Sequence, residues 1–97
     1  MTSRTYTLEQ QLAAPNFLLS NTSSQPVGSK LTFGTYTQPD VTIYYTTDGS
    51  TPTTGSNVYN PTTGVILNNA PLEFVRAIAV ASGYLNSNPS AKIYLLH

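Results

Sequence analysis

Hydrophobic and polar residues alternate along short stretches of this chain with a period of two. The alternation is clearest in Val41 to Thr47 and recurs in Lys30 to Phe33 and Thr5 to Leu8. Successive side chains of an extended strand point to opposite faces, so this period places apolar groups on one buried face. The pattern therefore predicts strands rather than helices.

Turn residues divide the rest of the chain into further short segments. The other expected strands are Asn16–Leu19, Asn57–Tyr59, Val65–Leu67, Leu72–Ala81 and Ser90–Leu96. Leu72 to Ala81 is apolar at almost every position, which fits a central strand covered on both faces or a helix; Pro71 before it and Gly83 after it favour the strand. About seven short strands with a turn roughly every 8 to 12 residues predict an all-β, immunoglobulin-like or fibronectin-III-like antiparallel sandwich.

Two strands have patterns that assign faces. In the first, the expected inward residues are Val41, Ile43 and Tyr45, and the expected outward residues are Thr42, Tyr44 and Thr46. In the last strand two faces compete, and Lys92 shares the face of Tyr94 and Leu96. Because a charged residue disfavours burial, the period slightly favours the other face, with Ala91, Ile93 and Leu95, as the interior one.

An Asp-Gly pair ends the clearest strand. Asp48 and Gly49 suit the two positive-φ positions of a type I′ turn, so we expect them at the tip of a hairpin. Ser50 and Thr51 follow, and with Asp48 they offer some of the oxygen ligands of a calcium site. The hairpin turn alone is the favoured interpretation.

Length and charge limit the classes of function. The 97 residues fit one domain, with the sandwich expected at 14–97 and an N-terminal arm or extra edge strand at 1–13. Four basic and four acidic residues give zero net charge and no basic stripe, which argues against nucleic acid and anionic membranes as partners. No apolar run is long enough for membrane insertion, and no signal peptide follows Met1.

The polar surface is mostly uncharged. Ser, Thr, Asn and Gln make up more than a third of the chain, a composition common on secreted, cell-surface and virion proteins, and Cys is absent. We therefore expect an extracellular, cell-surface or virion location. Asn21 begins an Asn-Thr-Ser glycosylation pattern, which is frequent by chance in such chains.

The order of these features resembles the chitobiase and β-hexosaminidase C-terminal domain family, also described as fibronectin-III-associated repeats. The residues that carry the resemblance are Ala14–Phe17, Leu31–Phe33, Thr42–Thr53, Tyr59, Arg76–Tyr84, Asn86–Ser87 and Tyr94. Residues 1–13 lie outside the pattern, and Asn21 to Ser24 replaces its usual Gly-Thr-aromatic element. The resemblance implies an immunoglobulin-like sandwich that serves as a non-catalytic module of larger secreted bacterial proteins.

Catalytic chemistry has few candidates in this sequence. Nucleophilic catalysis needs a base beside its nucleophile, yet the single histidine is the terminal His97. Glycoside hydrolysis needs two facing carboxylates, and Asp40 and Asp48 are explained by their turns. We therefore expect no enzyme activity, no catalytic residues, no cofactor and no metal.

Tyrosine is the one residue type that suggests binding. An outward Tyr44, with Tyr36, Tyr59 or Tyr84 on loops, is a candidate flat surface for sugar rings or a protein partner. The alternative, which the family resemblance favours for Tyr45, Tyr59 and Tyr94, is that tyrosines complete the core and keep their hydroxyls at its edge.

Two functions follow as hypotheses. The first is a structural or docking module that contributes protein–protein contacts to a larger assembly, such as a capsid decoration, a tail component or a cell-surface structure. The second is a carbohydrate-binding accessory module of a secreted glycan-degrading enzyme. The strand pattern at Thr5–Leu8 adds a partner hypothesis, because an edge strand can add to another subunit's sheet.

Overall fold

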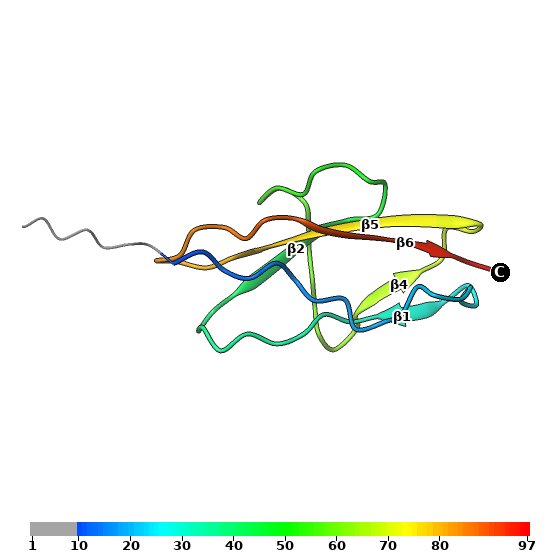
Figure 1. Cartoon of the computed structure of the whole chain (residues 1–97), viewed down its shortest axis with the longest axis horizontal. Helices are drawn as coiled ribbons and strands as arrows, with labels where there is room; N and C mark the ends of the chain where they lie inside the picture. Colours follow the sequence, from blue (N-terminus) through cyan, green and yellow to red (C-terminus); the bar gives the residue numbers. More distant parts are fainter. Residues whose placement is uncertain (1–9) are drawn as a thin grey trace, which may run out of the picture.

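The described chain is a sandwich of two antiparallel sheets. The computed structural model describes residues 10–97, and these contain no helix. The larger sheet has the order β3-β2-β5-β6, and the smaller sheet pairs β1 with β4, which lie side by side in Figure 1. The strands are β1 (Ser29–Leu31), β2 (Thr42–Thr46), β3 (Asn57–Val58), β4 (Val65–Leu67), β5 (Leu72–Val80) and β6 (Ser90–Leu95). The predicted all-β sandwich is confirmed, with six strands instead of about seven.

The expected strand at Asn16–Leu19 is reduced to a single bridge. Phe17 pairs with Phe33, and the Leu18 N–H donates to the Thr32 carbonyl at 3.0 Å. Pro15 has no N–H to donate, and Ser20 turns the chain by bonding to Thr22. Pairing therefore ends after one bridge.

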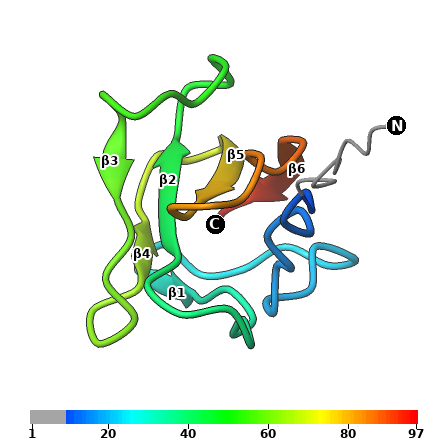
Figure 2. The ribbon, with the colours of Figure 1, turned by 90° about the vertical axis from the view of Figure 1, so that its left-hand side faces the viewer.

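The core lies between the two sheets (Figure 2). Its buried residues are Phe17, Leu31, Phe33, Ile43, Val65, Leu67, Val75, Ala77, Tyr94 and Leu96. The Phe33 ring stands at the centre of two edge-to-face contacts, 5.0 Å from Phe17 and 4.9 Å from Tyr59. A smaller cluster packs Leu12 against Ala79 and Ala81.

β5 is the central strand of the larger sheet, between β2 and β6, as predicted. Its expected burial on both faces holds only for its second half. Ile78 is buried, but Leu72 and Phe74 are 54% and 42% exposed on the outer face of the sheet. Within residues 10–97 no second layer covers that part of the strand.

The predicted face of β6 is wrong. Tyr94 and Leu96 point into the core, whereas Ile93 and Leu95 are 46% and 53% exposed. The Tyr94 hydroxyl donates to the Leu19 carbonyl at 2.8 Å, so this polar tip is satisfied inside the fold. Lys92 does not prevent this arrangement, because a lysine stem packs along apolar surface while its amine reaches water.

In β2, Ile43 is buried in the main core as predicted, whereas Thr46, expected to face outward, is covered by a loop. Thr46 is buried, and its hydroxyl donates to the Ser50 carbonyl at 2.7 Å, because the following loop folds back over it. Tyr44 lies on the outer face beside Ile78, as expected, although it is half-buried.

The expected type I′ hairpin at Asp48-Gly49 is also wrong. Ten residues, 47–56, connect β2 to β3. A type I′ turn needs positive φ at both central residues, and of the two only Gly49 has it, at 81°. The Gly49 N–H donates to the Phe74 carbonyl at 3.0 Å, so this turn is tied to β5 instead of linking β2 directly to β3.

The arm at 1–13 is described only from Gln10 onward, and the expected strand at Thr5–Leu8 lies outside the described residues. The Leu12 N–H donates to the Leu85 carbonyl at 3.1 Å, and the Gln11 side chain bonds to Asn86 and Asn88. Residues 10–12 are thus joined to the loop before β6.

Candidate functional site

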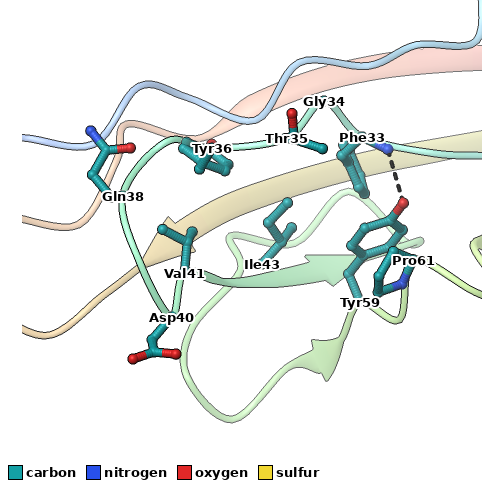
Figure 3. A pocket seen from close by; sticks show the side chains of 10 residues that line it. All are labelled: Phe33, Gly34, Thr35, Tyr36, Gln38, Asp40, Val41, Ile43, Tyr59 and Pro61. Carbon is teal, nitrogen blue, oxygen red and sulfur yellow. Dashed lines mark hydrogen bonds between the residues drawn. The ribbon is translucent and has the colours of Figure 1, made fainter.

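One hollow of the described surface is a cleft of about 310 Å³, here named the Tyr36–Tyr59 cleft (Figure 3). It is lined by Phe33, Gly34, Thr35, Tyr36, Gln38, Asp40, Val41, Ile43, Tyr59 and Pro61. Residues 34–41 belong to the connection from β1 to β2, which spans residues 32–41, and Tyr59 directly follows β3. Fold topology therefore brings together two tyrosines that are far apart in sequence.

Both tyrosine rings of the cleft are held by their hydroxyls. The Tyr59 hydroxyl accepts a hydrogen bond from the Phe33 N–H at 3.2 Å. The Tyr36 hydroxyl donates to the Ala13 carbonyl at 2.7 Å, and burial raises the pKa of Tyr36 above its usual value. The rings are therefore positioned before any ligand arrives.

A second hollow of about 290 Å³ adjoins this cleft. Both are lined by Gly34, Thr35, Tyr36 and Gln38, and the second also by Ala14 and Asn16 from the N-terminal segment. Tyr36 thus lies at the boundary of two neighbouring depressions.

Polar groups line the cleft beside its apolar walls. They are the Thr35 hydroxyl, the Gln38 amide and the Asp40 carboxylate, which is the one charged group among the lining residues. Asp40 is exposed and has φ 57°, a left-handed conformation that aspartate tolerates better than most residues. The cleft can therefore offer hydrogen bonds next to two aromatic rings.

The four tyrosines singled out from the sequence do not form one flat surface. Tyr36 and Tyr59 share the cleft. Tyr84 is half-buried against the small cluster around Leu12, which Tyr36 also contacts. Tyr44 lies on the outer face of the larger sheet, away from the core that Tyr59 joins.

The Asp48 turn lines a separate polar hollow of about 210 Å³. The Asp48 carboxylate accepts hydrogen bonds from the Ser50 hydroxyl at 2.6 Å and the Ser50 N–H at 3.0 Å. These bonds lower the pKa of Asp48 below its usual range. Residues 10–97 hold no group of three or more His, Cys, Asp or Glu side chains arranged to bind a metal ion.

The sequence interpretation missed an apolar ladder on the outer face of the larger sheet. Its members are Leu72, Phe74, Ile93 and Leu95, which are 42–54% exposed. Leu72 pairs with Leu95 and Phe74 with Ile93 across β5 and β6, so the four side chains are contiguous. Leu72 and Phe74, which share one face of the predicted strand at Leu72–Ala81, were a signal for it, but the wrong face assigned to β6 hid the other half.

In the part of the chain that the structure describes, no helix has the length and apolar character that crossing a bilayer requires.

Of three comparisons with known proteins, one identifies a family. A search of curated proteins and a search of solved structures gave no match. The family model of the chitobiase/β-hexosaminidase C-terminal domain matches residues 19–93, about three quarters of the chain. Domains of this family are C-terminal accessory modules of secreted glycoside hydrolases. The match includes every strand except the last two residues of β6, and the chain belongs to this family.

Proposed function

We propose that this domain is a non-catalytic docking module of an extracellular assembly, such as a virion or cell-surface structure, and that copies of it associate through the apolar ladder. The observation that carries this proposal is the exposure of Leu72, Phe74, Ile93 and Leu95 in one contiguous group. Contiguous apolar patches on soluble domains commonly mark contact surfaces.

The absence of charge on the ladder favours a second copy of the chain as its binding partner. None of the four ladder residues is charged, and the chain has zero net charge, so two ladders can face each other without like-charge repulsion. The adjacent Arg76 is half-buried and its guanidinium donates to the Gly49 carbonyl at 3.2 Å. An isologous contact, with the same patch on both copies, is the commonest arrangement of dimers.

The small size of the ladder limits the strength of this contact. Standard interfaces bury about 800 Å² on each partner, and four partly exposed side chains provide only the centre of such an area. We therefore expect weak association that depends on concentration, strengthened when many copies are held together in an assembly.

Sedimentation velocity of the purified chain tests the proposal. The sedimentation coefficient should rise between about 10 µM and 1 mM, the range of weak protein contacts. Ile93→Thr should weaken association about tenfold by replacing apolar contact area with a hydroxyl.

Ile66→Thr is the matched control, because Ile66 is 47% exposed against 46% for Ile93 but lies on β4 of the other sheet. It should leave association unchanged. A monomer at every concentration, or equal weakening by both variants, would overturn docking through the ladder.

A second candidate function is carbohydrate binding as an accessory module of a glycan-degrading enzyme. It is favoured by the family, whose name comes from two glycoside hydrolases, and by the Tyr36–Tyr59 cleft with its aromatic walls and polar groups. The two candidates use different surfaces, so a test of one does not decide the other.

A further inference from the structure

We propose that the Tyr36–Tyr59 cleft binds one ring of a neutral saccharide and that a longer glycan continues past Tyr36 into the adjoining hollow. This inference rests on the second candidate function and adds to it a site, a ligand class and a direction for the glycan chain. It does not involve the apolar ladder.

The walls of the cleft suit the C–H face of a sugar ring. Phe33, Val41 and Ile43 supply apolar surface between the two tyrosines, and Pro61 adds to it beside Tyr59 (Figure 3). Because both tyrosine hydroxyls are already bonded to the backbone, a ligand would not have to order these rings.

The polar groups of the cleft suit sugar hydroxyls. Thr35, Gln38 and Asp40 together provide hydroxyl, amide and carboxylate groups. Among the residues drawn in Figure 3, the one hydrogen bond joins the Phe33 N–H to the Tyr59 hydroxyl. The three polar side chains are therefore not engaged with the other lining residues and can bond to a ligand.

Charge favours a neutral ligand over a cation. Asp40 is the one charged lining residue, and its side chain is exposed to solvent. A solvated carboxylate gains little from pairing with an ammonium group, whereas it readily accepts hydrogen bonds from hydroxyls.

The volume sets how much of a glycan fits. A cleft of about 310 Å³ is at the small end of ligand sites, which suits a single ring. The second hollow of about 290 Å³ shares Tyr36 with the first, so a second ring has a place beside it. We therefore expect a trisaccharide to bind more tightly than its monosaccharide.

Two-dimensional ¹H–¹⁵N NMR titration tests the site with named probes: N-acetylglucosamine, its trisaccharide, cellotriose and, as the cationic alternative, choline. Saturable shifts should appear for at least one trisaccharide and should be confined to residues 13–16, 33–41 and 59–61. Fitting the shifts gives the dissociation constant for each probe.

Three variants separate the contributions. Tyr36→Leu removes the ring but keeps apolar bulk, and should weaken trisaccharide binding about tenfold. Asp40→Asn keeps the tolerated left-handed backbone and should weaken saccharide binding less than Tyr36→Leu. Tyr44→Leu is the matched control on the outer sheet face and should have no effect.

Several outcomes would overturn the proposal. The first is that no saccharide causes shifts at about 10 mM, a concentration well above the dissociation constants of weak specific sites. The second is that the shifts centre on Tyr44 or Tyr84. The third is that choline binds, loses its binding in Asp40→Asn, and no saccharide binds. If Tyr36→Leu does not fold, Gln38→Ala in the same cleft replaces it and should weaken trisaccharide binding. Sedimentation of the same samples tests the apolar ladder separately.

Discussion

At the residue scale, Gly49 and Gly83 share a backbone conformation but have different surroundings. Their φ values are 81° and 84°. A Cβ on Gly49 would lie 3.0 Å from the Phe74 ring, whereas a Cβ on Gly83 would meet nothing within 4 Å. The pair therefore separates backbone strain from steric conflict.

We predict that Gly83→Ala lowers the free energy of unfolding by about 1 kcal/mol, the cost of a left-handed alanine. Gly49→Ala should lower it by about 2 kcal/mol or more, because the Phe74 ring must also shift. Urea unfolding of both variants checks this. Equal losses would mean that the Phe74 contact carries no energy.

Tyr94 combines complete burial with a satisfied hydroxyl. Its side chain has no exposed surface, its hydroxyl donates to the Leu19 carbonyl, and burial raises its pKa to about 12. An unfolded tyrosine titrates near pH 10. The stability that this group contributes is therefore fully present below about pH 10 and is lost as pH rises from about 10 to 12.

We predict that the free energy of unfolding falls as pH rises from about 10 to 12, and that Tyr94→Phe reduces this fall. At pH 7 the same variant should cost about 1 kcal/mol through the lost hydrogen bond. Urea unfolding at each pH gives both numbers, with Tyr44→Phe on the outer sheet face as control. An unchanged alkaline slope in Tyr94→Phe would contradict the assignment.

At the element scale, the last residue of β6 and the residue after it lie on opposite faces, one exposed and one buried. Leu95 is 53% exposed, whereas the next residue, Leu96, is 5% exposed and belongs to the main core. The Leu96 N–H also donates to the Pro71 carbonyl at 2.8 Å, which continues the pairing with the start of β5. Two adjacent leucines thus report which face is buried.

We predict that Leu96→Ala destabilises the domain by about 2–4 kcal/mol, because it leaves a cavity in the core. Leu95→Ala should cost less than about 1 kcal/mol, since its side chain is largely solvated. Chemical unfolding monitored by tyrosine fluorescence measures both. The reverse order would restore the face expected from sequence.

At the scale of the whole molecule, residues 10–13 are joined to the opposite end of the sequence. Leu12 is 2% exposed and packs on Ala79 and Ala81, and Gln11 bonds to the loop that precedes β6. The Tyr36 hydroxyl also donates to Ala13, so this segment helps to form one side of the candidate site.

We predict that a chain beginning at Ala14 loses about 2 kcal/mol or more of stability relative to the full chain, mainly through the lost burial of Leu12. A chain beginning at Gln10 keeps these contacts and should be more stable than the chain beginning at Ala14. Thermal unfolding compares the three. Sedimentation of the same chains tests whether Thr5–Leu8 contributes to self-association, which remains a prediction.

The sequence by itself determined the fold class and the family. It also located the central strand, observed at Leu72–Val80, and the strands observed at Val65–Leu67 and Ser90–Leu95. These follow from local properties, namely the period of two, β-branched and aromatic residues, and turn residues between runs. Only the tertiary structure decided which face of β6 is buried, that Thr46 is covered, and that Tyr36 and Tyr59 share a cleft while Tyr44 does not. The reason is physical: burial depends on what packs opposite a side chain, here the Leu19 carbonyl for Tyr94 and the Ser50 loop for Thr46, and such partners lie outside any local pattern.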